Sequence, residues 1–242
     1  MDVFYLTDKI FLKDDKLFYK EKEIKNHNWH RLLKDYGWEK LNKIWIRKLN
    51  SYLKKPLNNS LFGCLDCGGE GDCLFYCISY ALKSKELYNI NYECDVQSLR
   101  KLLSDSIDRK RYNEIISIYK VLSESNDFDE DWDPHSITYR GFKDKLIEGG
   151  NEYWGDNILL NLLKEVLNVN LIVLNSNEIT REYYNYPLLY DYDEKLKTII
   201  LLYENNNHFK LIGSFQNGNM ITLFEHENIP VEIFKVINYL RL

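Results

Sequence analysis

One short stretch of the sequence combines a reactive residue type with a backbone that could serve it. Cys73 follows the glycine-rich run at 68–71 and precedes residues with the apolar spacing of a helix. The N–H groups of a helix's first turn have no internal partner and carry partial positive charge, which favours the thiolate form of a cysteine placed there. Backbone N–H groups around Gly71 to Cys73 could also face an oxyanion that forms beside the sulfur. The spacing alone therefore predicts a nucleophile at Cys73.

A cysteine nucleophile needs a base that takes its proton and later returns it to the leaving amine. Of the five histidines, His208 is the best candidate, because it stands at the corner of a predicted hairpin that fixes the ring and leaves it open to a cleft. A third group should orient the imidazole and stabilise its charged form. Asn206 could reach the ring across the turn, and Asp66 and Glu70 are the alternatives.

Two other kinds of site are less well supported. Cys64 and Cys67 have the spacing of zinc ligands, but no second C-x-x-C follows, and Cys73 and Cys77 lie four apart on a helical pattern. Cys77 and Cys94 fit better as small buried apolar residues. The glycine run lacks the Gly-Lys-Ser/Thr ending of a phosphate-binding loop. No metal and no cofactor is expected.

Composition limits the classes of partner and compartment. The chain has 242 residues, of which 45% are hydrophobic and 29% charged, with a formal net charge of −5. A net negative charge argues against binding to nucleic acid or to an anionic membrane. No secretory signal or 18-residue apolar run is present, and five clustered cysteines indicate reduced thiols. We expect a cytoplasmic monomer.

The elements around these residues predict an α+β fold in which helices precede a mostly antiparallel sheet. The first 20 residues predict a hairpin and 38–53 a helix, and the break at 56–60 separates an N-terminal extension, 1–60, from a catalytic domain, 61–242. Asp95 and Asp156 are predicted helix N-caps. The expected later elements are a helix at 112–122, strands at 171–174, 198–203, 208–212 and 220–224, and a helix after Pro230.

Three blocks of the sequence resemble the OTU (ovarian tumour) family of cysteine proteases, in that family's order. Residues 68–75, GGEGDCLF, are similar to its nucleophile motif, usually Asp-Gly-Asn/Asp-Cys-Leu/Phe-Phe/Tyr. Residues 153–157 with the strand at 169–173 resemble its helix–strand signature, and 201–209 its strand–turn–His motif. The blocks cover about residues 61–213. The resemblance implies a papain-like fold with a small, mostly antiparallel central sheet flanked by helices.

The resemblance also implies a function, a deubiquitinase that hydrolyses isopeptide bonds at the C-terminus of ubiquitin. Cys73 would be the nucleophile and His208 the general base and acid. Ubiquitin, polyubiquitin chains or a ubiquitin-like modifier would be the partners. A ubiquitin-binding module with weak or no catalysis is the alternative. The composition and the C-terminal extension suggest a member from a large DNA virus, acting in host cytoplasm.

Further site residues follow from the same resemblance. Gly71, Asp72, Trp154 and Phe209 would belong to the oxyanion and substrate site, and a channel near Trp154 and His208 would suit the flat ubiquitin tail. The sequence departs from the family twice. Glu70 stands where the family usually has Asp, and Lys210 stands where many members have the Asn or Asp that orients the histidine. A lysine cannot accept a hydrogen bond from the imidazole, so Asn206 is the predicted orienting residue.

Overall fold

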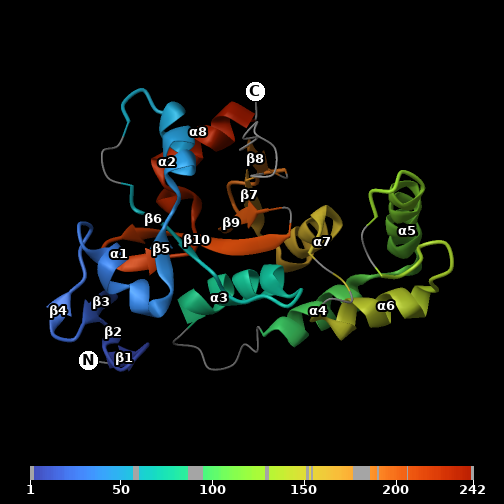
Figure 1. Ribbon diagram of the computed structural model, residues 1–242, viewed down its shortest axis with the longest axis horizontal. Helices are drawn as coiled ribbons and strands as arrows, with labels where there is room; N and C mark the ends of the chain where they lie inside the picture. The colour runs from blue at the N-terminus through green and yellow to red at the C-terminus, as the bar shows by residue number, and fades with distance from the viewer. Residues whose placement is uncertain are drawn as a thin grey trace. The chain divides into compact units, whose positions relative to one another are not determined.

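The computed structural model describes residues 3–56, 60–86, 95–128, 131–150, 153, 155–176, 186–189, 191–205 and 207–240. The chain forms two compact units (Figure 1). We call residues 1–67 and 170–242 the sheet unit, and residues 68–169 the helical unit.

The sheet unit is built on one mixed sheet with the strand order β5-β6-β10-β9-β7-β8. These strands are β5 (Trp38–Lys40), β6 (Phe62–Leu65), β7 (Asn170–Ser176), β8 (Tyr186–Leu189), β9 (Thr198–Glu204) and β10 (His208–Gln216). The short strands β11 (Asn219–Ile221) and β12 (Leu223–Phe224) pair with β10 and β9. Of the described strand pairs, only β7 with β9 is parallel. The predicted α+β class and mostly antiparallel sheet are therefore confirmed.

Helices α2 (Lys43–Ser51) and α8 (Val231–Leu240) cover one face of this sheet. Trp45 and Leu49 of α2 and Ile233 and Val236 of α8 are buried with the even-numbered residues of β7 and β9. The Trp45 indole N–H donates to the Ser176 hydroxyl over 2.5 Å, so the core carries no unpaired indole at this point. The predicted strands at 171–174, 198–203 and 208–212, and the helix after Pro230, lie where the sequence places them.

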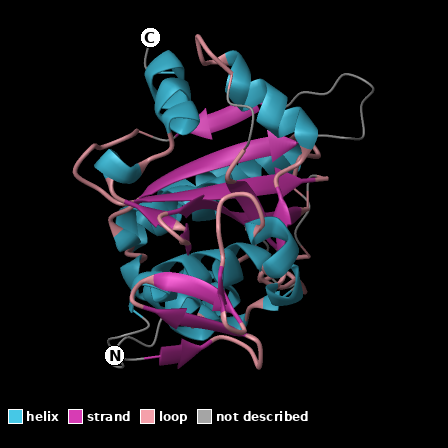
Figure 2. Cartoon of the chain, turned by 90° about the vertical axis from the view of Figure 1, so that its left-hand side faces the viewer, coloured by secondary structure: helices cyan, strands magenta, loops and turns pink. Residues whose placement is uncertain are grey.

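The first 60 residues differ from their predicted form. They contain a four-stranded antiparallel sheet (Figure 2) of β1 (Val3–Tyr5), β2 (Ile10–Lys13), β3 (Lys16–Tyr19) and β4 (Lys22–Glu23), where the sequence indicated a hairpin. Helix α1 (Trp29–Leu32) and the 3-10 turn η1 (Lys34–Tyr36) follow. The segment then supplies strand β5 to the central sheet.

The predicted helix at 38–53 was wrong at its start. Trp38–Lys40 is strand β5, and helix α2 begins only at Lys43. Its N-cap is Asn42, whose side chain accepts a hydrogen bond from the Trp45 N–H. Trp38 is buried against Gly63 and Gly213, on neighbouring strands, where an added Cβ would lie only 2.7–3.0 Å from its ring. The packing of the Trp38 indole on these two glycines therefore determines that residues 38–40 form a strand, although the apolar spacing there is that of a helix.

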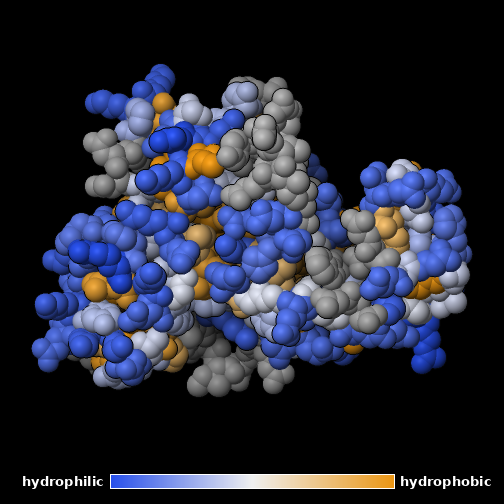
Figure 3. All heavy atoms as spheres, viewed as in Figure 1, coloured by the Kyte–Doolittle hydropathy of each residue, from blue (hydrophilic) through white to orange (hydrophobic). Residues whose placement is uncertain are grey.

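The helical unit contains α3 (Cys73–Glu86), α4 (Val96–Ser106), α5 (Arg109–Glu124), α6 (Tyr139–Glu148) and α7 (Asn157–Leu167). Four of these helices begin at a side chain that accepts an N–H of the first turn, namely Asp95, Asp108, Thr138 and Asp156. The predicted caps at Asp95 and Asp156 are therefore confirmed. On the side of α5 and α6 that faces the viewer in Figure 3, hydrophilic residues surround a few apolar ones.

In neither unit is any described helix long and apolar enough to cross a membrane. A short 3-10 turn, η3 (His226–Asn228), leads into α8 and completes the described elements.

Candidate active site

Cys73 is the first residue of α3 and follows a loop whose shape depends on glycine. Gly68 and Gly71 have φ angles of 135° and 85°, and Glu70 has a φ of 58°. The Asp72 N–H closes a turn onto the Gly69 carbonyl over 3.2 Å, and the Tyr76 N–H bonds back to the Asp72 carbonyl over 2.9 Å. The Cys73 side chain is 6% exposed. The predicted helix N-terminus at this thiol is thus present.

Two of the other described cysteines, Cys64 and Cys77, lie in surroundings less suited to a nucleophile. Cys64, on β6, has its pKa raised to about 11 by burial, so it stays a thiol near neutral pH. Cys77 is fully buried within α3, as expected of an apolar residue. Cys94, for which the same role was predicted, lies outside the described residues. Among the residues with assigned positions, no three His, Cys, Asp or Glu side chains form a metal-binding group.

Asp72 is engaged inside the helical unit. Its Oδ1 accepts from Nε of Arg100 at 2.7 Å, and its Oδ2 accepts from the Gly150 N–H at 3.1 Å. Both the carboxylate and the N–H of Asp72 therefore have partners within the unit, and its place in the oxyanion and substrate site stays a prediction. Gly71 lies in the turn beside it, and Glu70 places an exposed side chain on the loop.

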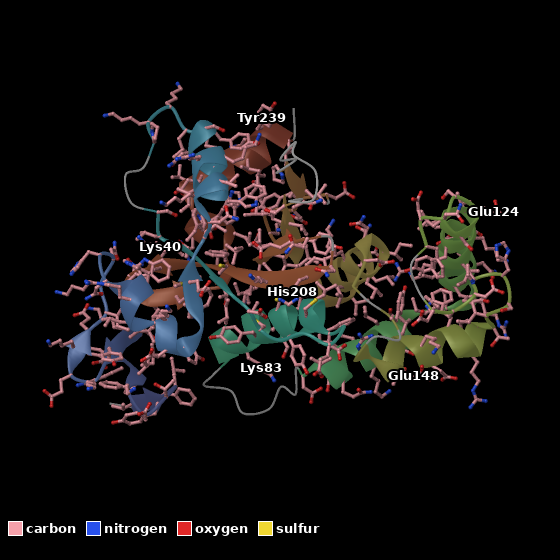
Figure 4. The ribbon with its side chains drawn as sticks, viewed as in Figure 1. Lys40, Lys83, Glu124, Glu148, His208 and Tyr239 are labelled. Carbon is pink, nitrogen blue, oxygen red and sulfur yellow. The ribbon has the colours of Figure 1, made fainter. Side chains whose placement is uncertain are left out.

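His208 is the first residue of β10 and pairs with Glu204 across the β9–β10 hairpin (Figure 4). Its Nε2 lies 3.1 Å from Oδ2 of Asp66, directly after β6. The side chains of His208 and Asp66 are 26% and 57% exposed. The contact lacks the alignment of a hydrogen bond, so its attraction comes mainly from charge when the ring is protonated. Two adjacent strands, β6 and β10, hold these two residues together.

Lys210 does not contact the imidazole in the way an Asn or Asp at this position would. Its Nζ lies 2.8 Å from Oε2 of Glu204 on the neighbouring strand. Burial is the largest single influence and lowers the Lys210 pKa. The hydrogen bond and charge of Glu204, with smaller contributions from Cys64 and Asp66, together raise the pKa above its ordinary value, so the group stays a cation. Phe209 is 3% exposed and its ring packs on Tyr203 at 4.5 Å, which places it in the core beneath the hairpin.

Two predicted site residues, Asn206 and Trp154, lie outside the described residues. Of the two alternatives to Asn206, Asp66 is the one that belongs to the sheet unit and lies at His208, whereas Glu70 belongs to the helical unit.

Sequence reasoning missed Arg100, which reaches the nucleophile loop from α4. Its signal was available: Arg100 lies on the same helical face as Leu99 and Leu103, where a charged residue is unexpected.

Comparison with known proteins places the chain in a family. The model of the family described as OTU-like cysteine protease matches residues 68–209, more than half of the chain. No curated protein matches.

Several solved structures are similar to the chain. An OTU domain solved in complex with ubiquitin is 17% identical, with 73% of this chain and 83% of that chain covered and a TM-score of 0.41. An OTU deubiquitinase from Wolbachia pipientis wMel is 15% identical, with coverages of 77% and 99% and a TM-score of 0.40. The viral OTU domain protease from Farallon virus is 16% identical, with coverages of 66% and 85% and a TM-score of 0.40.

Every one of these TM-scores is below 0.5, so the assignment rests on the family match. That match begins five residues before Cys73 and ends one residue after His208, so it takes in both residues that the sequence selected for chemistry. This chain belongs to the OTU-like cysteine protease family.

Proposed function

We propose that this protein is a thiol-dependent deubiquitinase in which Cys73 attacks the isopeptide carbonyl at the C-terminus of ubiquitin and His208 serves as the base. The observation that carries this proposal is the single family match across residues 68–209, which joins both residues.

The chemistry requires few parts. His208 accepts the thiol proton, and the Cys73 thiolate adds to the carbonyl carbon. Backbone N–H groups near Gly71 and Cys73 stabilise the oxyanion. The imidazolium then gives its proton to the departing lysine amine, leaving a thioester. Water, deprotonated by the same ring, hydrolyses that thioester and restores the thiol.

Asp66 is the proposed orienting residue. Its carboxylate lies 3.1 Å from Nε2 of His208, which leaves Nδ1 as the ring nitrogen that exchanges protons with sulfur. Lys210 is paired with Glu204 and has no acceptor to offer the ring. The contact supports Asp66 over Glu70, and Asn206 stays the prediction from the sequence.

The substrate class follows from the family, and the loop is compatible with it. An added Cβ on Gly69 would meet nothing within 4 Å, so the loop is open there to a flat peptide such as the two glycines that end ubiquitin, whereas Gly68 packs against the Tyr76 ring. Trp154 and Phe209 are the other proposed substrate-site residues, although Phe209 contributes through packing. Two of the similar structures contain ubiquitin: the OTU domain in complex with it and the Hazara virus OTU bound to it.

A second candidate function is ubiquitin binding with little catalysis. Lys210 favours it, because the side chain at this position forms an ion pair with Glu204 and cannot orient His208. The enzyme should cleave ubiquitin chains and the binding module should not, so labelling and cleavage assays on the same proteins distinguish the two.

The experiment is labelling with ubiquitin whose C-terminus carries a vinyl ester electrophile. Wild type should form a covalent adduct, and Cys73→Ala should form none. Cys67→Ala is the matched control, because Cys67 is a half-buried thiol close in sequence, and it should label like wild type. His208→Gln should label at least roughly a hundredfold more slowly.

Di-ubiquitin cleavage and ubiquitin affinity complete the test. Cleavage by wild type and its loss in Cys73→Ala support the enzyme. A folded wild-type sample that binds ubiquitin but neither labels nor cleaves supports the binding module and rejects the enzyme. Labelling that persists in Cys73→Ala places the nucleophile elsewhere.

A further inference from the structure

Arg100 is a charged side chain in the core of the helical unit. It lies on α4 between Leu99 and Leu103 and has no exposed surface. A guanidinium cannot lose its charge in a protein, so burial at such a site demands partners for every N–H group. The contacts of Arg100 show what those partners are.

Arg100 contacts three different segments of the helical unit. Its Nε and Nη2 lie 2.7 Å and 2.5 Å from Oδ1 of Asp72. Nη1 donates to the carbonyl of Leu146 at 3.3 Å, and Nη2 donates to the carbonyl of Tyr153 at 3.1 Å. The guanidinium also lies 4.1 Å from the ring centre of Phe75, two residues after Cys73 in α3. Arg100 therefore connects the nucleophile loop, the end of α6 and the segment that leads towards α7.

The chain around 149–150 is shaped for this contact. Gly149 and Gly150 both have positive φ angles, 79° and 62°. A Cβ on Gly149 would lie 3.2 Å from Nε of Arg100 and 3.5 Å from Oδ2 of Asp72. A side chain there would press on the ion pair, while glycine lets the Gly150 N–H reach the carboxylate. The Asp72 carboxylate is thus held on both of its oxygens.

Asp72 also precedes the proposed nucleophile directly. An unpaired carboxylate beside Cys73 would oppose formation of the thiolate, because like charges disfavour each other. Two nitrogens of the guanidinium converge on Oδ1 and offset that charge, and the Gly150 N–H binds Oδ2 and fixes the direction of the carboxylate.

We propose that Arg100 is a positioning residue for the reaction, acting through Asp72: it neutralises the carboxylate next to Cys73 and fixes the 68–72 loop. This inference rests on the proposed function only in taking Cys73 as the nucleophile.

The other charged groups of this unit are placed differently. Glu70 is exposed on the loop, and Lys83 is exposed near the far end of α3. Lys101 and Asp105 form an exposed pair with each other on α4. His208 and Asp66 belong to the sheet unit and are unchanged in every variant compared below. Asp156 is buried too but has neutral partners, the Tyr119 hydroxyl and the Leu159 N–H. A mutation of Arg100 or Asp72, in contrast, leaves the charge of the other residue unbalanced.

The test is the pH dependence of Cys73 alkylation by iodoacetamide, read at that residue by peptide mass spectrometry on the full chain. In Arg100→Met the alkylation midpoint should move up by about one pH unit, because Asp72 is left uncompensated. The double variant Arg100→Met with Asp72→Asn should return the midpoint to that of wild type. Arg111→Met is the matched control, since it removes an ion pair with Glu165 in the same unit away from the loop, and it should leave the midpoint unchanged.

Turnover of di-ubiquitin gives a second reading. Arg100→Met should lower kcat at least roughly tenfold with little change in KM, because the loop acts on the chemical step. Arg100→Lys keeps the charge and should keep the midpoint within about 0.3 pH units of wild type, although it loses hydrogen bonds.

Should Arg100→Met fail to fold, Asp72→Asn alone decides the matter. It leaves a cation without its anion near Cys73, so the midpoint should fall, and a rise would overturn the proposal. An unchanged midpoint in folded Arg100→Met would also overturn it. Alkylation does not depend on ubiquitin, so failure of the proposed function would appear in the ubiquitin probe and failure of this inference in the pH profile.

Discussion

One carboxylate adjoins each member of the proposed catalytic pair: Asp72 precedes Cys73, and Asp66 lies at His208. The two carboxylates differ in burial and in the kind of partner they have. Asp72 of the helical unit is 18% exposed and bonded to a fully buried arginine. Asp66 of the sheet unit is 57% exposed and lies against a histidine that is charged only when protonated. The first pairing is permanent, and the second changes with each proton that the histidine gains or loses.

This difference teaches that a carboxylate's role follows from its partner and its burial. A buried pair with arginine can hold a loop, because breaking it leaves a charge in the core. An exposed pair contributes little to folding, but it can still set the direction of an imidazole ring. We therefore expect Asp72 to matter most for the fold and Asp66 most for the rate.

The largest effect on stability is expected from Asp72→Ala. Loss of the carboxylate leaves the Arg100 guanidinium buried without its anion, which should cost about 3–5 kcal/mol. Urea unfolding followed by circular dichroism measures this cost. Arg111→Met, which breaks a more exposed pair with Glu165, is the control. An equal loss in both variants would contradict the special position of Asp72.

The largest effect on rate with little effect on stability is expected from Asp66→Asn. The imidazolium formed during the reaction loses its counter-charge, so kcat for di-ubiquitin should fall roughly tenfold or more. The free energy of unfolding should change by less than about 1 kcal/mol, because the pair is largely exposed. An unchanged kcat would assign the orienting role to Asn206 or Glu70.

Asp156 sharpens the comparison, because it is a buried carboxylate whose partners are neutral. It accepts from the Tyr119 hydroxyl at 2.5 Å and the Leu159 N–H at 2.7 Å. Burial raises its pKa, and these hydrogen bonds only partly oppose the rise. The native state therefore holds the Asp156 proton more tightly than the unfolded chain does, so this residue's contribution to stability falls as pH rises from about 4.

Asp156→Asn should remove that decline while keeping the helix cap, since asparagine caps as well as aspartate. The measurement is the free energy of unfolding of both proteins at pH 4 to 7. Asp95→Asn is a control of opposite sign: hydrogen bonds from the Ser98 N–H and hydroxyl lower the Asp95 pKa, so that carboxylate stabilises the fold above its unfolded pKa and stops doing so as pH falls. The same trend in both variants would refute this interpretation of Asp156.

The smallest effect is expected from Lys210→Met. Lys210 is paired with Glu204 and does not orient His208, so kcat should stay within roughly twofold of wild type, as for most surface changes. If Lys210→Met loses as much activity as Asp66→Asn, the position two residues after the histidine takes part in catalysis after all.

Much of this organisation could be predicted from the sequence where the signal is local. The glycine run before Cys73, the caps at Asp95 and Asp156 and the buried strand at 171–174 depend on neighbours in the chain, and all are present. Trp38 was misassigned because its conformation depends on Gly63 and Gly213, which are distant in sequence.

The site shows the same division between local and long-range signals. Cys73 and His208 could be selected by residue type and position. The contact of Asp66 with His208 joins residues 142 apart in the sequence, and that of Arg100 with Asp72 joins residues 28 apart. Helical and strand periodicities do not predict contacts at such separations. The sequence could therefore offer Asp66 only as one alternative among three, and it gave Arg100 no role.

The packing around Gly63 also limits how far this protein can be truncated at its N-terminal side. An added Cβ on that glycine would lie 2.9 Å from the Trp29 ring and 3.0 Å from the Trp38 ring, and Trp29 stacks on Phe215 of β10. A fragment that starts at residue 61 would lose both indoles and expose β6 along an open edge, which invites aggregation. A minimal recombinant version should therefore begin upstream of Trp29, although the family match starts only at residue 68.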